Sequence, residues 1–250
     1  MPRAYTRVLL FFLVTYALTW VGNLGNYLWP SDAWPRPMNP LGPLVAAPLV
    51  LWLYDGGPAV AAWFRRILRF RAPPWLYATA FLLPLAIILG SVGLAIAIGT
   101  KSGPLPSYAA SEFIIGIPIV LLFGPLPEEP GFRGLGLHEL RDSMTTLTAA
   151  LIIGLGVLIW HLPLFLTGDL PLPIAVVLPA VSVVYAWLYT RGGSVWPLVL
   201  AHWVQNYFGG NFFGMVFAPP DQWIWLSFLT VAYLLWAALL VWRYGPELGR

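Results

Sequence analysis

Six ionisable or amide side chains stand in otherwise apolar segments of this chain. Two adjacent carboxylates and an arginine follow the apolar run Phe113–Phe123, in the stretch GPLPEEPGFRG at positions 124–134. Because an ionisable residue at membrane depth costs about 2.5–3.5 kcal/mol on insertion scales, each such residue in a membrane span is a candidate functional group. The six candidates are Glu128, Glu129, Arg133, His161, His202 and Asn206.

Helical spacing gives the two carboxylates different roles. Residues on an α-helix turn by about 100° each, so Glu129 and Arg133, four apart, share a face in the favourable order for an ion pair. Glu128 points elsewhere. We therefore expect Arg133 to neutralise Glu129, and Glu128 to face a cavity. His202 and Asn206, also four apart, present an imidazole and a carboxamide on one face.

A glutamate, two histidines and an asparagine can hydrolyse an amide in two ways. In the first, Glu128 is the general base for a water that His161 also holds, while His202 and Asn206 donate hydrogen bonds to the oxyanion. In the second, Glu128, His161 and His202 bind a zinc ion that activates the water. Spacing alone leaves both open, so no cofactor is assigned and zinc stays an alternative.

The residues that several other kinds of catalytic site require are absent from the sequence. The chain has no cysteine, which excludes disulfides, thiolate metal sites and a cysteine nucleophile. It contains no HExxH, no GxSxG and no membrane-embedded pair of aspartates. The net charge of +3 is spread over the loops, so a nucleic-acid partner is not expected.

Composition predicts an integral membrane protein. The chain is 59% hydrophobic and 9% charged, with a mean hydropathy of +0.77, whereas soluble domains carry about 25% charged residues. With a span needing about 20 apolar residues, we predict one all-α membrane domain over residues 1–250, with a core near 112–210. The eight predicted spans are Val8–Trp29, Leu41–Tyr54, Trp75–Gly99, Phe113–Leu137, Thr145–Leu166, Leu172–Thr190, Ser194–Phe217 and Ile224–Trp242.

Cationic residues predict the orientation. Cytoplasmic loops of membrane proteins carry an excess of lysine and arginine. In the eight-span arrangement, eleven of these residues fall on one side of the membrane and two on the other. Only Arg36 and Lys101 fall on the second side. We therefore expect both termini to lie in the cytoplasm. The expected location is the plasma membrane of a prokaryote, which the protein would cross several times. The arginine-rich segment 58–74 is expected to form an interfacial helix.

The depth of the candidates sets a condition on the fold. An α-helix rises by about 1.5 Å per residue, which gives each candidate a depth in the membrane measured from the cytoplasmic end of its predicted span. On this measure His202 is the shallowest, Glu128 lies deeper and His161 lies deepest. Helix tilt or a later entry of the fifth span must bring His161 and Glu128 together if they act on one water.

The six residues lie in motifs that resemble those of the CPBP family, the CAAX proteases and bacteriocin-processing enzymes also called the ABI family. Glu128, Glu129 and Arg133 match EExxxR, His161 ends an FxxxH motif, and His202 and Asn206 match HxxxN. Their order on three separate spans also agrees. The one departure is Val157, which stands where the family usually has phenylalanine in FxxxH.

The resemblance implies an intramembrane endopeptidase, of the type that includes CAAX prenyl endopeptidases, acting on a membrane-associated protein or peptide in the bilayer. Whether this substrate carries a lipid is left open. The resemblance implies that Glu128 and His161 activate water, His202 and Asn206 hold the oxyanion, and Glu129 and Arg133 support the site. The family is often labelled metalloendopeptidase, but its better-understood members look glutamate-dependent, which favours the metal-free mechanism.

Two non-proteolytic functions compete with this interpretation. A non-catalytic scaffold or bacteriocin-immunity protein could use the same fold to bind a partner, and loss of Glu128 or His202 would favour it; this sequence keeps both. A small-solute transporter predicts inverted repeats, and the sequence shows no such symmetry.

Overall fold

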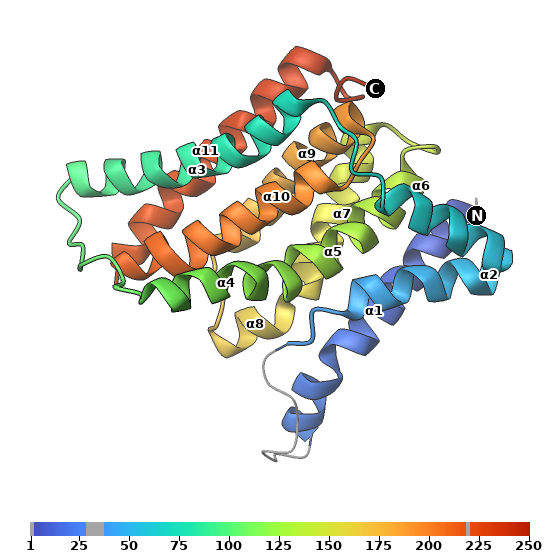
Figure 1. Ribbon diagram of the computed structural model, residues 1–250, viewed down its shortest axis with the longest axis horizontal. Coiled ribbons are helices and arrows are strands. Elements are labelled where there is room, and N and C mark those ends of the chain that lie inside the picture. Colours follow the sequence, from blue (N-terminus) through green and yellow to red (C-terminus); the bar gives the residue numbers. More distant parts are fainter. Residues whose placement is uncertain (1–2, 29–37, 219–220) are drawn as a thin grey trace.

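The computed structural model describes residues 3–28, 38–218 and 221–250. These residues form helices and no strand, which confirms the all-α prediction. Figure 1 shows the long helices running side by side in one bundle. The helices are α1 (Arg3–Leu28), α2 (Gly42–Ile67), α3 (Pro74–Ala97), α4 (Ala110–Leu122), α5 (Pro125–Gly131), η1 (Phe132–Leu137), α6 (His138–Leu140), α7 (Thr146–Trp160), α8 (Leu162–Thr167), α9 (Ile174–Gly192), α10 (Trp196–Val204), η2 (Gln205–Phe213), η3 (Gly214–Val216) and α11 (Asp221–Tyr244).

Six helical segments within the described residues are long and apolar enough to cross a membrane, which makes the chain a multi-pass membrane protein. The other two predicted spans, Thr145–Leu166 and Ser194–Phe217, are not continuous α-helices. The first is α7 followed after His161 by α8, and the second is divided among α10, the π-helix η2 and the 3-10 helix η3. These two interrupted segments carry His161, His202 and Asn206, so eight complete crossings stay a prediction.

Helix α2 bends where the sequence predicts a short span to end. Gly56 leaves the helical conformation at φ 73° and ψ −170°, and Pro58 follows it. A positive φ is readily adopted by glycine because it has no Cβ. The predicted span Leu41–Tyr54 is thus the first half of α2, and the predicted interfacial helix is the second half, which ends at Ile67 rather than at residue 74.

Both ends of the described chain lie at the same end of the bundle (Figure 1). The Tyr5 hydroxyl in α1 donates to the Ser143 carbonyl, and the Leu147 amide in α7 donates to the Pro246 carbonyl. The connection between α3 and α4 lies at the other end, where the Gly103 amide donates to the Val216 carbonyl. This arrangement agrees with termini on one side; that this side is cytoplasmic stays a prediction. Arg36 and Trp29 lie outside the described residues.

An aromatic cluster fixes the helices that carry the candidate residues. The Phe132 ring in η1 lies 6.0 Å from Phe11 in α1 and 5.5 Å from Trp160 in α7, measured between ring centroids. Trp160 also donates from Nε1 to the Thr19 hydroxyl oxygen over 2.8 Å. All three rings are fully buried. Since Phe132 adjoins Arg133 and Trp160 adjoins His161, this packing sets the separation of two candidate residues.

A glycine allows α2 and α5 to approach closely, and its substitution gives the first prediction. A Cβ on Gly131 would lie 2.6 Å from the Pro43 carbonyl oxygen, so Gly131→Ala must push the two helices apart. Overpacking of this kind costs about 1–3 kcal/mol. We expect a lower melting temperature in detergent for Gly131→Ala. Gly90→Ala on α3, where a Cβ meets nothing within 4 Å, is the control; equal melting temperatures for the two variants would show that this contact is not tight.

Candidate active site

The segment that carries both glutamates begins a new helix. Helix α4 ends at Leu122, Gly124 is non-helical, and α5 starts with Pro125 at its first position. A proline is tolerated there because its missing N–H would have no partner within the helix. The winding then widens to the π-helix η1 directly after α5, and such π segments are frequent at functional sites.

Glu129 is the buried centre of an ion-pair network. Its Oε1 accepts a hydrogen bond from Arg133 Nη1 over 3.2 Å, which confirms the predicted pair. The same oxygen lies 2.8 Å from His202 Nδ1 on α10, a contact that spacing along the chain did not predict. Because an ionised carboxylate only accepts, this Nδ1 carries the proton. The neutral His202 ring would therefore have its lone pair at Nε2, and only the imidazolium would donate from there.

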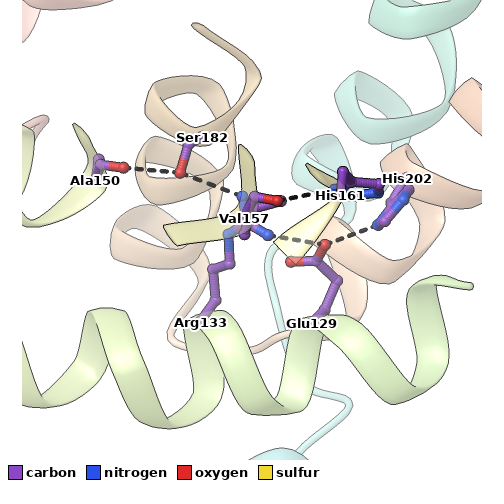
Figure 2. Close-up of polar contacts among 7 residues, drawn as sticks. All are labelled: Glu129, Arg133, Ala150, Val157, His161, Ser182 and His202. Atoms are coloured by element: carbon purple, nitrogen blue, oxygen red, sulfur yellow. Dashed lines mark hydrogen bonds and ion pairs between the residues drawn. The ribbon is translucent and has the colours of Figure 1, made fainter. Parts of the chain in front are cut away.

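Arg133 extends the network to two further helices. Its Nη2 donates to the Ser182 hydroxyl oxygen over 3.2 Å, and that hydroxyl donates to the Ala150 carbonyl over 2.8 Å. Figure 2 shows these contacts continuing through Glu129 to His202. The network joins α5 and η1 to α7, α9 and α10, so it fixes the face that His202 presents.

Tyr185 and Ser182 are parts of the site that the sequence reasoning missed. The Arg133 guanidinium lies 5.1 Å from the centroid of the Tyr185 ring, and that ring lies 6.0 Å from the His202 ring. Both residues are buried on α9, three positions apart. Polar groups at this spacing share a helix face, which was the available signal.

Glu128 lies apart from these contacts. Its side chain is buried to 6% exposure, and no hydrogen bond between described residues involves its carboxylate. Glu129, its neighbour, is 0% exposed and takes part in the network. The predicted division between a paired and an unpaired carboxylate is therefore confirmed.

His161 lies at the break between α7 and α8, where its backbone ends one helix and begins the next. Its Nδ1 lies 2.9 Å from the Val157 carbonyl oxygen (Figure 2). A carbonyl only accepts, so Nδ1 is the donor and the neutral ring has its lone pair at Nε2. Val157 itself is buried at 4% exposure, as expected for a position that packs rather than reacts.

Asn206 follows the change from α10 to η2. Its amide Nδ2 lies close to Gly124, where a Cβ would be only 3.1 Å from that nitrogen. The preceding residue, Gln205, accepts a hydrogen bond at Oε1 from the Tyr233 hydroxyl over 2.6 Å. The π-helical winding therefore places two carboxamides beside the network, of which the sequence reasoning found only Asn206.

All six predicted residues line one cavity of about 320 Å³. Glu128 and His161 both line it; that they come close enough to act on one water stays a prediction. Beyond the polar end, the lining is mostly apolar and comes from α9 and α11. These apolar residues include Val177, Leu178, Val181, Trp225, Leu226 and Leu229. The arrangement can hold a water beside a carboxylate and can bind an apolar chain next to it.

The zinc alternative does not fit this arrangement of donors. Among the described residues, no group of three histidine, aspartate or glutamate side chains is placed to hold one metal ion. Glu128, His161 and His202 share the cavity without forming such a group.

The comparison with protein families matches the same part of the chain. Residues 110–208 match the family described as type II CAAX prenyl endopeptidase Rce1-like. A search of curated proteins gave no match. The matched segment runs from α4 into η2 and contains all six candidate residues, which confirms the resemblance seen in their motifs. Residues 110–208, the segment that carries the candidate site, are therefore similar to the Rce1-like family of type II CAAX prenyl endopeptidases.

Proposed function

We propose that this protein is an intramembrane endopeptidase that hydrolyses a peptide bond of a membrane-associated protein or peptide. The observation that carries the proposal is the single cavity lined by Glu128, His161, His202 and Asn206, residues from separate helical segments. The protease family of residues 110–208 supports the same function. The site retains Glu128, His161, His202 and Asn206, so no observation favours a non-catalytic scaffold or immunity protein.

In the proposed mechanism, Glu128 and His161 hold and activate the water. The Glu128 carboxylate takes the proton as the water oxygen attacks the peptide carbonyl, and it returns that proton to the leaving amine. His161 accepts a hydrogen bond from the same water at Nε2, since its Nδ1 is turned to the Val157 carbonyl. A carboxylate with no hydrogen bond to a described residue suits a general base.

His202 and Asn206 would stabilise the oxyanion of the tetrahedral intermediate. Asn206 donates from its amide, and His202 donates from Nε2 as an imidazolium, because its Nδ1 proton is held by Glu129. Glu129 stabilises that positive charge, and Arg133 holds Glu129 in place. Glu129 and Arg133 are therefore positioning residues.

The crowding of Asn206 gives a second prediction. A Cβ on Gly124 would lie 3.1 Å from both Asn206 Nδ2 and the Val120 carbonyl oxygen, so Gly124→Ala is expected to displace the amide by a fraction of an ångström. Misplaced catalytic groups lose about tenfold or more in rate, and we expect a loss of about tenfold in kcat. Gly93→Ala, with nothing within 4 Å of the added Cβ, is the matched control. A kcat equal to that of the control would remove Asn206 from the oxyanion site.

The apolar walls of the cavity support a substrate that reaches it from the bilayer. Further parts of the proposal are a single membrane domain over residues 1–250 and a location in the plasma membrane of a prokaryote. The arginine distribution supports a cytoplasmic opening of the site.

The function is tested by following cleavage of membrane-anchored peptides in proteoliposomes by mass spectrometry. Prenylated and unprenylated forms of each peptide are compared, with and without a chelator. We expect cleavage that the chelator does not abolish. Cleavage lost to the chelator and restored by zinc would overturn the metal-free mechanism, and the absence of cleavage across a library of membrane-anchored sequences would overturn the function.

A further inference from the structure

A second cavity, separate from the candidate active site, includes the last residue, Arg250, in its lining. Figure 1 shows that this residue lies at the same end of the bundle as the beginning of α1. The cavity measures about 480 Å³ and is formed by the end of α2, the residues after α6, the end of α9 and the last residue of the chain. Its lining side chains include five arginines and one aspartate, so the arginines outnumber the carboxylates of the lining by four. The lining residues are Arg65, Arg66, Arg69, His138, Arg141, Asp142, Tyr189, Thr190, Gly193 and Arg250; we call this the arginine pocket.

Several of its cations are held in place by the protein. Arg66 donates from Nε and Nη2 to the Gly134 carbonyl oxygen in η1, over 3.2 and 2.8 Å. The Arg141 guanidinium lies 5.7 Å from the centroid of the Tyr189 ring. Arg250 donates from Nη2 to Asp142 over 3.0 Å. The one side-chain carboxylate of the lining, that of Asp142, is therefore already paired.

Two cations at the rim have no such contacts. Arg65 and Arg69 are exposed, and neither forms an ion pair with another described residue. The N–H groups of a guanidinium form a fork, so two of them can donate to two oxygens of the same phosphate. These two side chains are free to close over an anion whose other oxygens meet the fixed arginines.

Two further observations favour an anion in this pocket. Thr190 lines the pocket, and its hydroxyl oxygen is buried and has no hydrogen-bond partner among the described residues; most buried polar groups do have one. Burial and the neighbouring Arg250 lower the pKa of the Arg141 guanidinium. An anion in the pocket would accept from the hydroxyl and relieve the crowding of positive charge.

We propose that the arginine pocket binds a phosphate group, from either an anionic lipid headgroup or a free phosphate. Its position at the end of the bundle that arginine counts predict to be cytoplasmic suits both sources, since anionic lipids attract basic residues there. Through Arg66 and Gly134 the pocket also contacts η1, the helix that carries Arg133.

The test measures ligand binding to the purified full chain in detergent. Inorganic phosphate is titrated against chloride at equal ionic strength, and dihexanoyl phosphatidic acid against dihexanoyl phosphatidylcholine, whose choline cancels the headgroup charge. We expect a saturable rise in melting temperature. A rise with both anionic probes means that the phosphate group is sufficient, and a rise with the lipid alone assigns the pocket to a headgroup. No saturable rise with either would overturn the proposal.

Variants separate the pocket from a general attraction to anions. The double variant Arg65→Gln with Arg69→Gln is expected to raise Kd about tenfold or more, because charge-assisted hydrogen bonds are lost. Arg71→Gln is the matched control: Arg71 is exposed on the same connection and does not line the pocket. Thr190→Val, which keeps the shape and removes the hydroxyl, should also weaken binding. An equal loss in Arg71→Gln, or no loss in the double variant, would contradict a defined site.

Discussion

Replacing Glu128 by glutamine is expected to lower kcat by about 10²–10⁴-fold, the contribution typical of a general base. The amide has nearly the shape of the carboxylate but cannot take a proton from water. Peptide cleavage in proteoliposomes measures the effect. The melting temperature should not fall, because the Glu128 carboxylate makes no hydrogen bond to a described residue that the change could break.

The control for this variant is Glu112→Gln. Glu112 is exposed on α4, in the same apolar helical segment Ala110–Leu140 as Glu128, and its carboxylate accepts from the Ala109 amide over 2.8 Å, outside the cavity. It should keep wild-type kcat. A Glu128→Gln protein that cleaves as fast as the Glu112→Gln protein would exclude Glu128 as the base.

Replacing Glu129 by alanine has the largest expected effect on stability. The change leaves Arg133 and His202 without the carboxylate that both contact. Removing one partner of a buried ion pair typically costs about 3–5 kcal/mol, because the other charge stays buried without compensation. We expect a marked fall in the free energy of unfolding in detergent, and loss of cleavage because His202 loses its orientation.

A compensating variant distinguishes this cause from poor packing. The double variant Glu129→Ala with Arg133→Met removes both charges, and replacing a buried pair by apolar groups is often close to neutral. It should recover much of the stability but not the activity. If the double variant is as unstable as Glu129→Ala alone, the unpaired arginine is not the reason for the loss.

The sequence predicts the helices well because apolar composition is a strong signal over twenty residues. It does not predict where an α-helix breaks or continues as a π-helix. The breaks at His161 and at Gln205 depend on backbone hydrogen bonds that tertiary packing selects, and hydropathy averages over them. The predicted end of the second span at Tyr54 lies close to the bend at Gly56.

Within the site, the sequence predicts contacts between side chains of the same helix. The pair Glu129 and Arg133 follows from a spacing of four. The contact of Glu129 with His202 does not, because it depends on how α5 and α10 are rotated against each other in the bundle. Ser182 and Tyr185 were missed for a related reason: in an apolar segment, serine and tyrosine are ordinary packing residues until an arginine is found beside them.

The central claim is that Glu128 and His161 act on the same water. A double-mutant cycle of kcat with Glu128→Gln, His161→Ala and both together tests it, because residues that act as a unit have strongly non-additive effects. We expect the double variant to be about as slow as the slower single variant. A double variant slowed by the product of the two single losses would mean that the two side chains act independently, and would contradict the shared water.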